Sequence, residues 1–301
     1  MKLKVMTFNL LYHGAVNPAG AWSARLPLVL DVLRSGADII AVQEATSVQI
    51  ADMVREMTEF VVVSGPESGE TRLPLSVQAA GRFLRGAFGG KPRHHAAVPV
   101  VDHGLARRGE HCAILYRADR FEMIEGNAFW LSHEPDIPGS VLHGSWLPRV
   151  VNWARLRERE SHDCVTVFNA HLDFLPWSPL RSARILRQSL DSHWNSDPQI
   201  LMGDFNAAPN SAAYRHLSAE LKRSVHPSLT DAWQAAEART GPEGTFHGGT
   251  GRIRWTGRLD RIFFRPDLRV EHVTTITHHQ GSVYPSDHYP VMAELELPQQ
   301  S

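Results

Sequence analysis

Two short runs place acidic, amide and imidazole side chains at the ends of apolar stretches. Asp204 and Asn206 directly follow the apolar run at 199–202, and Asp287 and His288 lie just before the last apolar run of the chain. Residues two apart at the end of an extended strand face the same side, about 6–7 Å apart, so Asp204 and Asn206 can bind a metal ion or hold a water together. His288 adds the one side chain type that normally titrates near neutral pH. This combination suggests hydrolytic chemistry.

The elements that would position these residues alternate at first and then become mostly strands. Apolar periodicity predicts strands at 3–10 and 38–42, each followed by an amphipathic helix, at 22–35 and 48–57. Further strands are predicted at 111–116, 121–130, 150–158, 163–171, 199–202, 259–264 and 291–297, and further helices at 178–192, 214–221 and 230–239. Because no repeat or Gly/Ser linker interrupts this order, we expect one domain with two packed sheets and outer helices.

The composition is that of a globular protein with enough apolar residues for a core. Of the 301 residues, 43% are hydrophobic and 21% are charged, and the formal net charge is −1. The net charge does not indicate a nucleic-acid binder, although a local basic patch could serve. Cys112 and Cys164 lie in predicted strands and are expected to be buried free thiols of a reducing compartment. No signal peptide and no transmembrane segment is evident, so a cytoplasmic protein is expected.

The segment 71–108 differs from the rest of the chain in its charge. It contains seven Arg or Lys residues and one acid, and it is rich in Gly and Pro. One interpretation is a solvated surface insertion, centred on 66–98. The other is a basic arm beside the site that attracts a phosphorylated substrate.

Polar residues recur where predicted strands begin or end, and sites often form where such strand ends converge. They are Asn9, Glu44, Glu110, Tyr116, Asn169, His171, Asp204, Asn206, Asp260, Asp287 and His288. This set is rich in oxygen ligands and lacks a Cys/His cluster. It therefore favours Mg²⁺ or Mn²⁺ over zinc.

Seven of these runs, in this order, resemble the motifs of the endonuclease/exonuclease/phosphatase superfamily, which has the deoxyribonuclease-I-like fold. They are MTFN at 6–9, VQE at 42–44, GEHCAILYR at 109–117, NAHLD at 169–173, GDFN at 203–206, LDRI at 259–262 and SDH at 286–288. The resemblance spans nearly the whole chain and implies a single domain at 1–301. The implied fold is α+β, a four-layer α/β/β/α sandwich of two packed mixed sheets. Other runs, such as YPSDHYPV at 284–291, look most like a bacterial group of the superfamily.

The resemblance also implies how the acidic and amide residues would act. Glu44 would be the principal metal ligand, with Asn9 beside it and Asp287 supporting the metal shell. Asp204 and Asn206 would orient the attacking water or hold a second metal. The expected cofactor is therefore Mg²⁺ or Mn²⁺, and the expected activity is that of a metal-dependent phosphoric ester hydrolase.

The histidines would each be coupled to a carboxylate. Asp260 would orient and polarise His288, and Glu110 would pair with His171. A carboxylate next to an imidazole fixes the tautomer and raises the imidazole pKa, so the ring can give or take a proton near pH 7. Three residues would contact the substrate phosphate: Tyr116, Arg149 and Asn169.

The substrate is open at the level of sequence, because the superfamily is chemically broad. We expect a nuclease or phosphodiesterase acting on phosphodiester bonds, with nucleic acid as a candidate substrate, and the basic segment supports this interpretation. The alternative is a phosphatase or phospholipase C acting on a sugar, inositol or lipid phosphate. The tryptophans are expected to belong to the core rather than to stack on bases.

Overall fold

The structure is a computed structural model of the chain. It describes residues 1–15, 17, 19–64, 100–102, 105–107, 109–145, 147–175, 177–195, 197–219, 226–254, 257–266 and 268–297. The predicted basic insertion at 66–98 lies outside the described residues, as does most of the basic segment 71–108.

One sheet carries the N-terminal strands. In the described residues it has seven strands, in the order β12 (Ala238–Thr240), β14 (Arg269–Thr275), β15 (Val291–Glu296), β1 (Lys2–Asn9), β2 (Ile39–Ala45), β6 (His111–Arg117) and β3 (Phe60–Ser64). The pairs β1–β2 and β12–β14 are parallel and the other pairs are antiparallel, so the sheet is mixed. A separate pair joins β4 (Val100–Asp102) to β5 (Leu105–Arg107).

The second sheet carries the middle of the chain. In the described residues it has six strands, in the order β11 (Thr230–Asp231), β13 (Asp260–Arg265), β10 (Gln199–Asp204), β9 (Cys164–His171), β8 (Val150–Glu158) and β7 (Phe121–Trp130). Its strands β9 and β10 run parallel and the other pairs run antiparallel. This sheet is therefore mixed as well.

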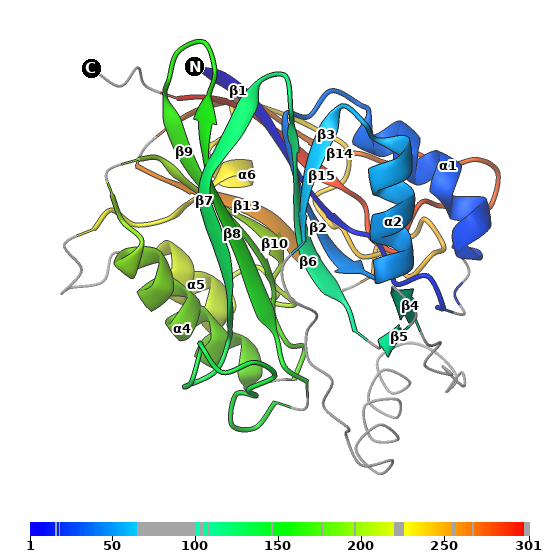
Figure 1. The fold of residues 1–301 in the computed structure, drawn as a ribbon, viewed down its shortest axis with the longest axis horizontal. Helices are drawn as coiled ribbons and strands as arrows, with labels where there is room; N and C mark the ends of the chain where they lie inside the picture. The colour runs from blue at the N-terminus through cyan, green and yellow to red at the C-terminus, as the bar shows by residue number, and fades with distance from the viewer. Residues whose placement is uncertain are drawn as a thin grey trace.

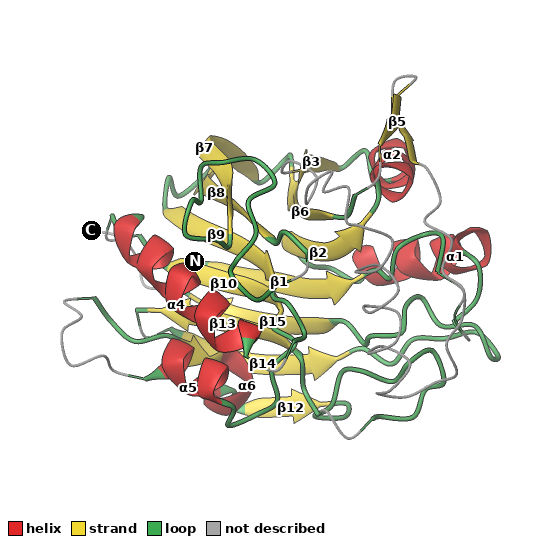
Figure 2. Ribbon diagram, turned by 90° about the horizontal axis from the view of Figure 1, so that it is seen from below, coloured by secondary structure: helices red, strands yellow, loops and turns green. Residues whose placement is uncertain are grey.

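Helices cover the outer faces of both sheets. The helices α1 (Trp22–Leu33) and α2 (Ser47–Glu56) lie over the first sheet, and α4 (Ser178–Ser192) and α5 (Ala212–Ser218) over the second (Figures 1 and 2). Three apolar clusters fill the layers between them: one between the sheets and one under each helix pair. The predicted four-layer α/β/β/α sandwich is thus confirmed.

Two predicted helices are shorter than expected. The predicted helix 214–221 is observed as α5, which begins at Ala212 and ends at Ser218. In place of the predicted helix 230–239, the structure has β11, the short α6 (Ala232–Ala235) and β12. The reason is that Ala238–Thr240 pairs with β14 at the sheet edge, and strand pairing outweighs the local helical pattern.

No helix in the described residues is long and apolar enough to cross a membrane. Cys112 is buried and Cys164 is partly exposed, and both are free thiols.

Candidate active site

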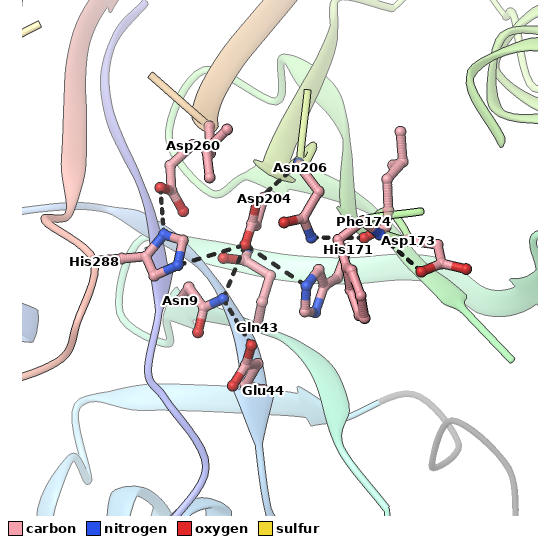
Figure 3. A network of polar contacts seen from close by, with 12 residues as sticks. Asn9, Gln43, Glu44, His171, Asp173, Phe174, Asp204, Asn206, Asp260 and His288 are labelled. Carbon is pink, nitrogen blue, oxygen red and sulfur yellow. Dashed lines mark hydrogen bonds and ion pairs between the residues drawn. The ribbon is translucent and has the colours of Figure 1, made fainter. Parts of the chain in front are cut away.

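The two sheets bring most of the predicted residues to one edge of the sandwich. Asn9 ends β1 and pairs with Gln43 of the parallel strand β2, while Asp204 of β10 pairs with His171 of β9 and with Asp260 of β13. These side chains meet because the parallel strands β9 and β10 end at the same edge of their sheet, and the antiparallel strand β13 begins there. Figure 3 shows six of them pointing toward one another: Asn9, Glu44, His171, Asp204, Asp260 and His288.

Asp204 lies at the centre of this group and is only 1% exposed. Its Oδ2 accepts a hydrogen bond of 3.0 Å from Asn9 Nδ2 and lies 3.6 Å from His171 Nε2 and 3.9 Å from His288 Nε2. Burial, and then the charge of Asp260, raises the pKa of Asp204 to about 6. This carboxyl group can therefore take up and release a proton close to neutral pH.

His288 is held by a buried carboxylate. Its Nδ1 donates to Asp260 Oδ2 at 2.8 Å, and the hydroxyl of Thr245 accepts from the Asp260 backbone N–H. Ser286 Oγ accepts from the His288 backbone N–H at 3.2 Å. Burial alone would lower the pKa of His288, but the charges of Asp260 and Asp204 raise it well above 6.5. The ring is therefore held as an imidazolium, with its Nε2–H directed toward Asp204.

Glu44 reaches the site through a local irregularity of β2. Its φ of 56° lies in the left-handed region, and the β2–β6 register shifts between Val42 and Ala45. Glu44 Oε1 accepts from Asn9 Nδ2 at 3.2 Å, whereas Glu44 Oε2 is buried without a hydrogen-bond partner. A buried, unpartnered carboxylate oxygen is costly, and a bound cation would satisfy it.

Arg149 and His171 form the wall next to Glu44. Arg149 Nη1 donates to His171 Nδ1 at 3.1 Å and lies 4.0 Å from Glu110 Oε2. The arginine is 6% exposed, and its Nε and Nη2 are buried without partners. Because Nδ1 of His171 accepts, the proton of a neutral His171 ring lies on Nε2, facing Asp204. A small pocket opens here, lined by Glu44, Glu110, His111, Cys112, Arg149, Val150 and His171.

Two groups of described residues could hold a divalent cation, and within each group the ligand atoms lie within 4.8 Å of one another. One is Glu44, Glu110 and His171, and the other is Asp204, Asp260 and His288. The second group already contains an imidazolium bound to Asp260. The group around Glu44, with its unpartnered Oε2, fits a hard cation better because it offers free carboxylate oxygen.

Asp287 and Asn206 flank this centre. Asp287 accepts from Asn17 Nδ2 at 3.1 Å, and its charge contributes to the raised pKa of His288. Asn206 has a φ of 46° and donates from Nδ2 to the Leu172 carbonyl at 2.8 Å, while its own backbone N–H binds Asp204 Oδ1. Both residues therefore hold loops of the site in place.

The structure corrects two expectations about phosphate contacts. Tyr116 pairs with Ile39 at the far end of β2 and packs in the core between the sheets, because β6 runs antiparallel to β2. Asn169 is fully buried between the sheets, and its Nδ2 donates to the carbonyls of Val42 and Ala113 at 2.8 Å each. Tyr116 lies away from the site, and Asn169 links the two sheets beneath it.

Sequence reasoning missed Arg25, which supports the site from α1. The residue is 0% exposed, and its guanidinium donates to the carbonyls of Leu10, Leu11, Gly20 and Pro285. Leu10 follows Asn9, and Pro285 precedes the loop of Asp287 and His288. Arg25 therefore ties together the two segments that carry these residues. A signal was present, since Trp22, Arg25 and Val29 share the buried face of the helix.

Comparison with known proteins identifies one family over nearly the whole chain. Residues 6–288 match the model of the Endonuclease/Exonuclease/phosphatase family. A search of curated proteins found no match.

Several solved structures are similar over nearly their full length. A mannosyl-6-phosphatase of Bacteroides thetaiotaomicron is 26% identical with a TM-score of 0.77, covering 98% of this chain and 100% of that chain. An endonuclease/exonuclease/phosphatase protein of Bacteroides vulgatus is 22% identical with a TM-score of 0.78, covering 99% and 100%. TDP2 of D. rerio, solved with a single-strand DNA product, is 14% identical with a TM-score of 0.64, covering 98% and 99%. The last two likenesses show the fold alone.

Proposed function

The chain belongs to the endonuclease/exonuclease/phosphatase family, and we propose that it is a divalent-metal-dependent hydrolase of phosphoric esters. The observation that carries this proposal is the buried contact between Asp204 and the His288–Asp260 pair, beside the unpartnered Oε2 of Glu44. A proton acceptor, a cationic proton donor and a cation ligand thus lie within one small site.

The side chains divide the work of the reaction between them. Asp204 accepts a proton from the attacking water, because its raised pKa of about 6 makes it a stronger base than an exposed aspartate. His288 stays cationic and donates from Nε2 to a phosphoryl oxygen, while Asp260 keeps its ring oriented. A divalent cation held by Glu44 and Glu110, beside Asn9, would neutralise phosphate charge and stabilise the leaving oxygen.

Arg149 supplies the remaining phosphate contact. Its Nε and Nη2 lie on one edge of the guanidinium, are buried beside the pocket and have no hydrogen-bond partner, so a phosphate entering the pocket would satisfy two donors. Such an edge matches two oxygens of one phosphate group, and the hydrogen bonds are charge-assisted. His171 anchors the other edge of the guanidinium through Nδ1, which fixes its orientation.

For the substrate, we propose a phosphomonoester of a carbohydrate. The mannosyl-6-phosphatase, which is 26% identical, supports a monoester, whereas the two donors of Arg149 could bind the non-bridging oxygens of a monoester or a diester. The phosphatase, which was the alternative in the sequence analysis, is therefore the first proposal here, and the nuclease or phosphodiesterase is the second. The second candidate is hydrolysis of phosphodiester bonds in nucleic acid, which the basic composition of 71–108 supports.

A substrate panel tests this proposal. Phosphate release would be measured from mannose 6-phosphate and p-nitrophenyl phosphate, and cleavage from bis-p-nitrophenyl phosphate and labelled single-stranded DNA, each with Mg²⁺, Mn²⁺ or EDTA. We expect metal-dependent release from the two monoesters at a kcat/KM well above that for either diester. Efficient cleavage of DNA with little monoester turnover would favour the second candidate. Equal rates with metal and with EDTA would contradict both.

A further inference from the structure

Trp177 is a tryptophan that the core does not use. Its side chain is 55% exposed, although most tryptophans are largely buried. A single exposed apolar residue is ordinary on a protein surface. Trp177 differs because its indole N–H is anchored, donating to the carbonyl of Gly144 at 3.0 Å. The ring is therefore held in one orientation with much of its surface open to solvent.

The segment beneath the indole is built to hold it. A Cβ atom at Gly144 would lie 3.0 Å from Trp177 Nε1, and the φ of +89° at Gly144 also disfavours other residues. Arg181 Nη1 donates to the carbonyl of His143 at 2.6 Å, and the hydroxyls of Ser145 and Ser178 lie 2.5 Å apart. These contacts fasten the loop after β7 to the start of α4 on both sides of the indole.

The contact between Trp177 and the loop of Gly144 lies at the same end of the sandwich as the active site. Trp177 is six residues beyond His171, and Gly144 is five residues before Arg149. An extended chain of that length spans at most roughly 20 Å. The real distance is shorter because the chain turns at Asp173, whose carboxylate accepts from the next two backbone N–H groups. Figure 1 shows the loop after β7 beside the start of α4, below the second sheet.

We propose that Trp177 is a specificity-determining residue, on whose exposed face a carbohydrate ring of the substrate alcohol stacks. The inference rests on the proposed function, in which the phosphate binds at Arg149 and His288. The electron-rich face of an indole attracts the weakly positive C–H groups of a pyranose ring. A fixed ring binds with little loss of side-chain freedom, because the anchoring to Gly144 has already removed that freedom.

The test compares a ring substrate with a substrate that has no ring. Mannose 6-phosphate and glycerol 3-phosphate would be assayed with Mg²⁺ for wild type, Trp177→Ala and Trp177→Phe. We expect Trp177→Ala to lower kcat/KM for mannose 6-phosphate about tenfold, the range of one stacking contact, mainly by raising KM. Glycerol 3-phosphate turnover should change less than twofold. Trp177→Phe, which keeps a ring, should recover most of the loss.

The matched control is Ile124→Ala, because Ile124 is 40% exposed on β7 toward the opposite end of the sheet. It should leave both substrates unchanged. Equal losses on both substrates in Trp177→Ala, or no loss on either, would overturn the stacking role while wild-type turnover still supported the proposed function. If wild type hydrolyses neither substrate, the proposed function has failed and the inference fails with it.

Discussion

Replacing Asp260 by Asn tests the role of the buried His288–Asp260 pair. The two groups are 2.8 Å apart, and both are almost fully buried, with side-chain exposures of 8% and 1%. The substitution preserves the shape of the side chain but leaves a buried imidazolium without its counter-charge. Breaking such a pair typically costs about 3–5 kcal/mol. If this energy is lost from the stabilisation of the transition state, kcat/KM falls roughly 100- to 5,000-fold.

The assay is phosphate release from mannose 6-phosphate with Mg²⁺, with circular dichroism to verify the fold. Asp231→Asn is a matched control, since Asp231 also forms a buried ion pair, 2.8 Å from Arg258, on the strand next to β13. We expect that control to lose stability but to keep kcat/KM within about threefold. A folded Asp260→Asn variant with kcat/KM within tenfold of wild type would refute the assigned role of the pair.

Three further predictions concern the supports of the site, which include His247, whose backbone N–H donates to the Asp287 carbonyl at 2.9 Å. Gly203→Ala should lower the free energy of unfolding by about 3 kcal/mol or more, because its Cβ would lie 1.9 Å from the Ala170 carbonyl oxygen. Urea titration would measure this change, and an unchanged midpoint of the unfolding transition would contradict the close approach. Arg25→Met should lower the free energy of unfolding by at least about 3 kcal/mol, since it leaves several buried carbonyls without a hydrogen-bond donor. Wild-type stability in this variant would contradict the role of Arg25 in joining the two segments. Burial lowers the pKa of His247 from 6.5 to about 3 in the folded protein. As the pH falls from 6.5 toward 3, the unfolded chain therefore binds a proton that the folded protein does not, and the free energy of unfolding decreases. Between pH 7 and pH 5, the free energy of unfolding of His247→Asn should therefore decrease by about 2 kcal/mol less than that of wild type. Identical pH dependence of stability in both proteins would contradict this prediction.

Apolar periodicity and motif order both depend on local residues, so the sequence was sufficient for the layers of the fold but not for β3, β14 or the break of 230–239 into β11, α6 and β12. Asp204, for example, directly follows a buried run, and a residue at that position must lie at the edge of the sheet. Tyr116 shows the limit of such reasoning. The pattern of β6 indicates a strand but not its direction, and only the antiparallel pairing with β2 places Tyr116 at the far end.

Long-range supports were also beyond local patterns. Asn169 has the spacing of a site residue, yet Gln43 and two backbone carbonyls occupy its amide between the sheets. Trp177 is anchored by Gly144, 33 residues away, a contact that no local pattern shows. Sequence reasoning therefore predicted chemical groups that the structure brings together at the candidate site, whereas their supports emerged only from the packing.

The most direct test of the central claim compares wild type with Asp204→Asn in phosphate release from mannose 6-phosphate. Each protein would be assayed with Mg²⁺ or Mn²⁺ and with EDTA. The proposed chemistry predicts release by wild type only with metal, and a loss of at least about 100-fold in the folded variant, because the buried base at the centre of the site is gone. Metal-independent release, or a variant as active as wild type, would contradict it.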